Sequence, residues 1–274
     1  MKVYTAALFF FILGISECCA EPDSLYIKPF KNQLIISVFT ASKVSTLDYE
    51  FDNNERVFNL QTYRPNSSVG MGVGLAWNWL SVSATLYNFK PNEKYGKTTS
   101  FDFQTHWFFS KFQLSVSLQD YTGFYTKDEE NENAIIIRPD LHIKQYYAFG
   151  QYVFNNKKFS YMSAFSYDQQ QLRSAGSLKA GLGIYYSEIS ADSSLYLGDS
   201  GKNRMYYKDY QIGPNVGYAH TFVFWRRCYF TASITAGLGL SVKNTDNKFR
   251  LFPTFLPRGS LGYNGSNWTV GVSA

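Results

Sequence analysis

Cysteine, histidine, proline and charge are all scarce in this sequence. Its 274 residues include only 3 Cys, 3 His and 8 Pro, and 17% of them are charged, against the roughly 25% that is usual for a soluble domain. After the first 15 residues, no apolar run approaches the roughly 20 residues that a transmembrane helix needs. These scarcities exclude a helical membrane protein and leave too few ligands for a zinc cluster.

Aromatic residues, in contrast, are abundant. The chain carries 24 Phe, 22 Tyr and 5 Trp, which together make up 19%, and its formal net charge is +5. So much aromatic and β-branched content would bury itself, which excludes a disordered chain. The net charge is too mild to indicate a nucleic-acid partner. What remains is a large soluble β-domain or a protein that meets lipid through its strands.

The N-terminus has the parts of a secretory signal peptide. Lys2 precedes an apolar run over residues 3–15, and Ala20 is the small residue before a cleavage site. We predict a signal peptide over residues 1–20 and a single domain over residues 21–274. A buried N-terminal helix and a lipoprotein are the alternatives.

Cleavage after residue 20 would leave Cys228 as the only cysteine. A single cysteine makes no internal disulfide and no metal cluster, so an exported chain must be stabilised in another way.

Strict alternation of apolar with small or polar residues is the main pattern of the chain. The longest example runs over residues 230–242, and others cover 69–77, 80–87, 112–119 and 178–184. Such alternation is typical of a strand with one apolar and one polar face.

Strand length and aromatic placement favour a membrane barrel over a soluble sandwich. The segments 111–125, 140–154 and 228–242 are much longer than the 5 to 6 residues of an average strand. Aromatic residues gather near strand ends, where an interfacial girdle would lie. They are Trp77 and Trp79, residues 107–109, Tyr121 with Phe124 and Tyr125, Tyr185 and Tyr186, and residues 222–225. A sheet that faces lipid must also close, because unpaired edge groups in hydrocarbon are costly. A soluble secreted β-sandwich stays the alternative.

The predicted fold is an all-β, antiparallel transmembrane β-barrel of about 12 strands, within a range of about 10 to 14. The predicted strands are 32–42, 57–77, 80–89, 98–109, 111–126, 140–154, 158–169, 177–188, 206–223, 228–242, 251–263 and 267–274. Tight turns should be periplasmic and long charged loops external. The predicted long loops are 43–56, 90–97, 127–139, 188–205 and 243–250. This strand list nevertheless places the long segment 188–205 with the tight turns, so one predicted strand is wrong or one inner loop is unusually long. The chain also lacks a terminal aromatic residue, which favours a barrel without its C-terminal strand or strands.

Six short motifs carry a family resemblance. They are Tyr63-Arg64-Pro65-Asn66, Lys94-Tyr95-Gly96-Lys97, Tyr121-Thr122-Gly123-Phe124-Tyr125, Arg138-Pro139-Asp140-Leu141, the segment from Tyr152 to Tyr161, and Ser174-Ala175-Gly176-Ser177. In this order they resemble a Bacteroidota family, the domain of unknown function 4421. The resemblance implies an exported outer-membrane β-barrel, and no catalytic residues come with it.

The candidate binding residues are polar groups expected in the lumen or at its rim. Asp102, Gln104 and His106 share one face of a predicted strand, His142 and Lys144 should likewise point into the lumen, and Arg138 and Asp140 flank Pro139 at a strand start. For the last pair, capping and ion pairing at the rim is the simpler interpretation and ligand recognition the alternative.

No motif indicates catalysis. A lipase of the outer membrane would need a Ser-His pair with a third residue that orients the imidazole, and no such pattern is evident around His106, His142 or His220. We therefore expect no catalytic residues, no metal and no cofactor. The expected protein is a non-enzymatic barrel, serving as a narrow channel, a structural component or a surface-interaction protein. A lipid- or lipopolysaccharide-modifying enzyme is the alternative.

The expected location is the bacterial outer membrane. The expected partners are outer-membrane lipid and lipopolysaccharide, with the barrel-assembly machinery during insertion. No nucleic acid is expected, and the protein is expected to be a monomer.

Overall fold

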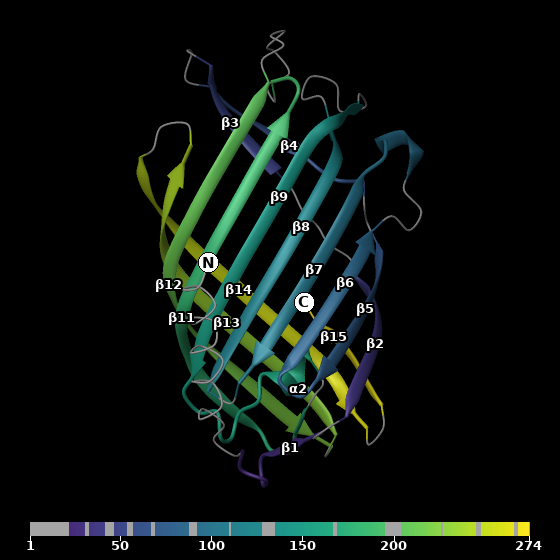
Figure 1. Ribbon diagram of the computed structural model, residues 1–274, viewed down its shortest axis with the longest axis vertical. Coiled ribbons are helices and arrows are strands. Elements are labelled where there is room, and N and C mark those ends of the chain that lie inside the picture. Colours follow the sequence, from purple (N-terminus) through teal and green to yellow (C-terminus); the bar gives the residue numbers. More distant parts are fainter. Residues whose placement is uncertain are drawn as a thin grey trace, which may run out of the picture.

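Antiparallel β-structure dominates the molecule (Figure 1). The computed structural model describes residues 22–30, 33–41, 47–53, 57–66, 69–87, 92–109, 111–127, 135–166, 169–194, 204–225, 227–244, 248–265 and 268–273. The predicted all-β fold class is confirmed. The predicted signal peptide lies outside the described residues.

One large sheet contains most of the strands. Its spatial order is β15-β14-β13-β12-β11-β9-β8-β7-β6-β5-β2. The bounds of these strands are β2 Leu34–Ala41, β5 Gly70–Trp77, β6 Leu80–Tyr87, β7 Thr99–Phe108, β8 Phe112–Lys127, β9 Ile135–Val153, β11 Ala175–Ala191, β12 Met205–Phe224, β13 Cys228–Lys243, β14 Phe249–Asn264 and β15 Thr269–Ser273. Within the part of the chain that the structure describes, no pairing joins the edge strands β2 and β15, so barrel closure is not detected.

Smaller elements lie at the two ends of this sheet. Strand β1 (Ile27–Pro29) pairs with β10 (Gln169–Gln171), β3 (Leu47–Asn53) pairs with β4 (Val57–Tyr63), and the helical turns are η2 (Glu93–Tyr95) and α2 (Met162–Phe165). In Figure 1, β1 and α2 lie at the lower end, and the large sheet curves so that β13 and β14 pass behind the strands in front. No helix among the described residues is long and apolar enough to cross a membrane.

Three predictions need correction. The predicted strand 158–169 is wrong, because residues 158–166 form turns and the helical turn α2, and Gln169 begins the short strand β10. The predicted strand 57–77 is two strands, β4 and β5, and the predicted loop 43–56 contains β3. The remaining segments correspond to strands of the large sheet.

Without a strand over 158–169, each connection between strands can be assigned to one end of the sheet without conflict. β9 and β11 are then direct neighbours, so β11 ends and β12 begins at the end of the sheet opposite to the tight turns after β5, β7 and β12. The tight turns of the large sheet therefore share one end, which we name the inner end. The long connections between its strands start and finish at the other end, the outer end, except for the connection from β9 to β11, which lies at the inner end. The prediction that segment 188–205 shares an end with the tight turns is wrong for this reason.

Alternation gives the sheet two unlike faces. On β12, Val216 is 63% exposed while its neighbour Asn215 is 5% exposed, because successive side chains of a strand point to opposite sides. We name the side of Val216 the outward face and that of Asn215 the inward face. On β5 the exposed Met71, Val73 and Leu75 alternate with glycines in the same way.

Inward-facing glycines let neighbouring strands approach closely. A Cβ added at Gly213 of β12 would lie 2.4 Å from Gly239 Cα of β13, and one added at Gly181 of β11 would meet the backbone oxygen of Gly150 on β9. Only a residue without a side chain fits at these points. They are the places where backbone, rather than side chain, lines the inward face.

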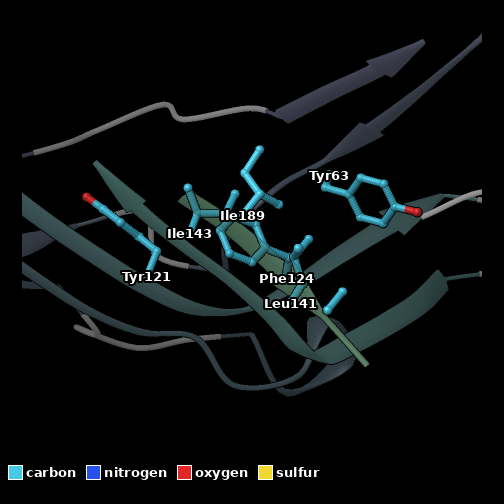
Figure 2. Close-up of a cluster of buried hydrophobic side chains, with 7 residues drawn as sticks. Tyr63, Tyr121, Phe124, Leu141, Ile143 and Ile189 are labelled. Atoms are coloured by element: carbon cyan, nitrogen blue, oxygen red, sulfur yellow. The ribbon is translucent and has the colours of Figure 1, made fainter. Parts of the chain in front are cut away.

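The buried apolar side chains form two clusters, one near each end. The outer cluster contains Tyr63, Tyr121, Phe124, Leu141, Ile143, Ile189 and Ala191, and Figure 2 shows Tyr63 meeting this group of side chains from β8, β9 and β11. The inner cluster contains Phe108, Val153, Phe159, Tyr161, Met162, Ala175 and Ala219. Tyr121 and Phe124 are therefore interior residues, although the sequence had placed them in an interfacial girdle.

Candidate functional site

The predicted trio on β7 lies on the inward face, as the alternation indicates. Asp102 is 2% exposed and accepts a 3.0 Å hydrogen bond from the Tyr121 hydroxyl. Gln104 lies opposite Ser117 of β8 and Ser83 of β6. This part of the interior is consequently lined with hydrogen-bonding groups.

His106 forms a pair with a serine. Its Nδ1 lies 2.8 Å from the Ser115 hydroxyl, and its ring stacks on Phe108. No carboxylate in the described ranges hydrogen-bonds His106. The pair faces inward, away from the apolar outward face.

Amides continue this polar interior towards the inner end. Gln113 donates to Gln151 at 2.7 Å, and Gln151 in turn donates to Asn215 at 2.7 Å, so three strands, β8, β9 and β12, are joined. All three side chains are buried. Chains of buried hydrogen bonds strengthen one another and fix the relative positions of the strands.

Arg138 and Asp140 form a clamp at the outer end. The guanidinium donates two hydrogen bonds to the carboxylate, at 3.0 and 2.9 Å, and two more to the carbonyl oxygens of Ser193 and Ser194, at 3.0 and 2.9 Å. The pair thus fixes the start of the long connection between β11 and β12. Because of its hydrogen bond to Arg138, Asp140 has a pKa below its usual range, and the same bond raises the pKa of Arg138.

Four of the six family motifs meet at the outer end. The Asn66 amide donates to the carbonyl oxygens of Asn92 and Gly96, at 2.7 and 2.5 Å. Thr98, which accepts from the Asn66 N–H, donates to the Gly123 oxygen at 2.6 Å. This network is hereafter the outer-end cluster, with the Arg138–Asp140 clamp included.

Aromatic and backbone contacts reinforce the outer-end cluster. Arg64 forms a β-bridge with Tyr125, and the Tyr95 ring stacks on that of Tyr125 with 4.4 Å between centroids. The Arg138 guanidinium lies 5.9 Å from the centre of the Tyr63 ring. The motifs at 63–66, 94–97, 121–125 and 138–141, distant in sequence, therefore build one structure.

His142 and Lys144 point outward, so the prediction that they face the lumen is wrong. They share a side of β9 with the exposed Tyr146, while Leu141 and Ile143 between them are buried. The physical reason is an irregularity in the β8–β9 pairing next to Gly123, whose φ is +88°. At such a bulge the alternation of side chains between the two faces is interrupted. Arg138 therefore faces inward while His142, four residues later, faces outward.

The outward face carries two polar rows near the outer end, and neither was evident from the sequence. The first consists of Tyr146, Tyr186 and Tyr210 on adjacent strands, with ring centroids 5.6 and 5.0 Å apart. The second, two residues nearer the outer end, alternates in charge: Asp120, Lys144, Glu188 and Lys208 lie opposite one another on β8, β9, β11 and β12. His142 adds a 2.6 Å contact to Asp120. Cross-strand register brings these charges together.

Residues 154–166 and 169–174 lie at the inner end. The Asn155 N–H donates a 2.9 Å hydrogen bond to the Ser177 hydroxyl, and the Asn155 amide donates to the Gly176 oxygen at 2.8 Å. The Ser260 hydroxyl of β14 donates to the Ala164 oxygen of α2 at 2.8 Å. These contacts join the two remaining family motifs, at 152–161 and 174–177. We name residues 154–166 and 169–174 the inner plug.

Two cationic side chains contact the inner plug. Lys179 of β11 has its Nζ 4.5 Å from the centre of the Tyr161 ring, and Arg258 of β14 has its Cζ 4.4 Å from that of Phe165. Lys179 is 2% exposed. Sequence reasoning missed both, although a lysine at an inward position of the glycine-rich strand 178–184 was a detectable signal. Among the described residues, no group of three or more His, Cys, Asp or Glu could hold a metal ion.

Comparison with the curated proteins and with the solved structures finds no match for this chain. A family model, the domain of unknown function DUF4421, matches residues 21–274, which agrees with the resemblance carried by the six motifs. This match covers nearly the whole chain. The chain therefore belongs to the DUF4421 family.

Proposed function

We propose that this protein is an outer-membrane β-barrel with a filled interior, which holds the outer-end cluster at the cell surface and has no enzymatic activity. The observation that supports this proposal most strongly is the outward face. Large apolar side chains are exposed there on almost every strand of the large sheet, among them Ile36, Val73, Leu182, Val216 and Leu238. Soluble monomers rarely expose apolar patches above a few hundred Å².

The height of the apolar zone fits a bilayer. On β12 the outward residues from Ile212 to Phe222 are apolar or aromatic apart from His220. Ten residue steps at about 3.3 Å, tilted by about 40°, span about 25 Å, the height of the apolar band of outer-membrane barrels.

Both borders of the apolar zone carry exposed aromatic residues. The exposed Tyr146 and Tyr210, with the half-buried Tyr186 between them, border it towards the outer end, and Trp77, Trp79, Phe224, Trp225 and Trp268 border it towards the inner end. Tyr and Trp prefer the interface between lipid and water. Beyond the tyrosines, the row from Asp120 to Lys208 would lie at the level of the lipid headgroups. Outer-membrane lipid and lipopolysaccharide are the partners that this arrangement favours.

The ends of the sheet support one orientation. Outer-membrane barrels have short periplasmic turns and long external loops, so the inner end would face the periplasm. The family match begins at residue 21, directly after the predicted cleavage site, which is in keeping with export and with insertion by the barrel-assembly machinery.

The interior favours a structural or surface-interaction role over an open pore. The outer and inner apolar clusters lie near the two ends, and buried hydrogen-bonded amides lie between them. Such an interior is in better keeping with a filled barrel than with the water-filled channel of a porin. The outer-end cluster, which unites four family motifs, is the surface best suited to contact a partner outside the cell.

One observation favours the enzymatic alternative, namely the contact between His106 and Ser115. A Ser-His pair can generate a nucleophile when a third residue orients the imidazole. Here the pair faces the interior rather than the lipid, and its histidine receives no hydrogen bond from a described carboxylate. The same contact serves equally well as a cross-strand link between β7 and β8.

Cell fractionation tests the proposal. The protein should sediment with outer membranes and should migrate faster on a gel without boiling than after boiling. Recovery in a soluble fraction, with no change of mobility on boiling, would contradict it and favour the soluble sandwich.

Cysteine labelling tests the orientation. Cys228 starts β13 at the inner end, and the exposed Glu93 lies at the outer end. A membrane-impermeant maleimide applied to intact cells should label a Glu93→Cys, Cys228→Ser variant and should not label the wild type at Cys228. Labelling of Cys228 alone would show the opposite orientation.

A further inference from the structure

Two cations meet on one aromatic ring inside the molecule. Tyr161, in the inner plug, has the Lys179 ammonium 4.5 Å from its ring centre and the Arg258 guanidinium 5.8 Å from it. The two side chains come from β11 and β14, which are not neighbours in the sheet.

Small residues let Lys179 reach this position. Its register partner on β12 is Gly217, and the next inward residue there is Ala219. The lysine crosses β12 over these two residues and donates a 3.0 Å hydrogen bond to Ser233 on β13. Ser233 is itself 3% exposed, so the ammonium ends in a buried polar position.

The two cations have no counterion among the described residues. No described carboxylate lies within ion-pair distance of Lys179 or Arg258. The inward carboxylate of Asp209 instead accepts hydrogen bonds from Ser241 and Gln211. A buried charge without a partner is strongly unfavourable. Within the described part of the chain, this position therefore has two positive charges and no negative charge to balance them.

We propose that Lys179 and Arg258 bind an oxyanion, a phosphate or carboxylate group, against the inner plug. A guanidinium offers two parallel N–H donors to such a group, and an ammonium adds a compact positive charge. Arg258 is exposed whereas Lys179 is buried, so the anion would enter from the side of Arg258 and be held at its far end by Lys179. The site is independent of the membrane proposal, because it uses only inward side chains.

Thermal unfolding in the presence of inorganic phosphate tests this site. The full chain, in whichever detergent or buffer keeps it folded, is melted with phosphate or with chloride at equal ionic strength. A ligand that binds only the folded state raises Tm, and a rise of about 5 °C is expected for wild type near saturation. The Lys179→Met and Arg258→Gln variants should lose this rise. Lys144→Met, which removes an outward lysine, should keep it.

Three outcomes overturn the proposal. They are no phosphate-specific rise in wild type, an equal rise in all variants, and a rise that appears only in Asp168→Asn. Asp168 lies outside the described residues, and the third outcome would identify it as an internal counterion. Because Lys179→Met replaces a buried charge with a side chain of similar volume, it should fold. Lys179→Arg keeps the charge and should retain part of the rise, which separates anion binding from a loss of packing.

Discussion

On the strands of the large sheet, apolar side chains are exposed on the outward face, whereas polar side chains are buried on the inward face. On β12 the apolar Val216 is 63% exposed, and the polar Asn215 next to it is 5% exposed. A soluble β-sheet buries its apolar face. Here the polar groups are buried, and many of them form cross-strand hydrogen bonds, such as the one that Asn215 accepts from Gln151. The comparison teaches that polar side chains are buried in this molecule where they can form interior hydrogen bonds, and the exposed apolar outward face supports the proposed contact with lipid.

The largest effect should come from the inward face, at Gly213. We expect Gly213→Val to prevent formation of the sheet, because the first side-chain carbon would lie 2.4 Å from Gly239 Cα and neither backbone can move without breaking the β12–β13 pairing. Circular dichroism and heat-modifiable gel mobility would measure the loss. Val216→Leu, three residues away on the outward face, is the matched control and should fold normally. A folded Gly213→Val variant would show that the close strand approach is unimportant.

The next effect should come from the outward face and should depend on depth. Val216 lies near the middle of the apolar zone, so Val216→Arg should lower the unfolding free energy in lipid by about 2 to 4 kcal/mol. Tyr206→Arg, beyond the tyrosine row, should cost about 0 to 1 kcal/mol. Denaturant titration in lipid vesicles would measure both. Equal, small costs at the two positions would mean that this face is not in contact with hydrocarbon.

Alternation made most of this sheet predictable from the sequence. The thirteen alternating residues from 230 to 242 correspond to β13, and the inward placement of Asp102, Gln104 and His106 follows from the same period of two. These features depend on neighbours along one strand. A single sequence carries that information directly.

Features that depend on contacts between distant segments could not be predicted. The segment 158–169 has the aromatic content of a strand, but it forms the inner plug because Phe159, Tyr161 and Met162 are buried against β7, β9, β11 and β12. The outward position of His142 depends on a bulge at Gly123, which only the β8–β9 pairing reveals. The pairing of Lys179 with Arg258 across Tyr161 joins residues far apart in the chain.

A smaller effect should come from the clamp at the outer end of the inward face. Arg138→Met removes four donated hydrogen bonds and leaves Asp140, whose side chain is 19% exposed, without its cation. We expect a loss of about 2 kcal/mol, measured by denaturant titration. Arg204→Met is the control, because its ion pair with Asp192 is largely exposed, and such pairs contribute little.

The pH dependence of stability examines the same clamp without a change of the arginine. The pKa of Asp140 is lowered in the folded state by its hydrogen bond to Arg138, so its contribution is present above about pH 4, the ordinary pKa of aspartate, and is lost as the pH falls further. The difference in Tm between wild type and Asp140→Asn should therefore shrink with decreasing pH. A difference that stays constant down to acidic pH would show that the carboxylate charge is not what stabilises the clamp.

The smallest effect should come from His106, although it is the residue most suggestive of chemistry. His106→Gln removes one hydrogen bond to Ser115 and should cost about 1 kcal/mol. On phospholipid micelles, purified wild type and His106→Gln should both show only the background hydrolysis of an empty preparation, with His142→Gln as the outward-facing control. Hydrolysis by wild type that disappears in His106→Gln and persists in His142→Gln would make the inward Ser-His pair catalytic. In that case the inward face would hold an active site that phospholipid can reach, and the interior would not be filled.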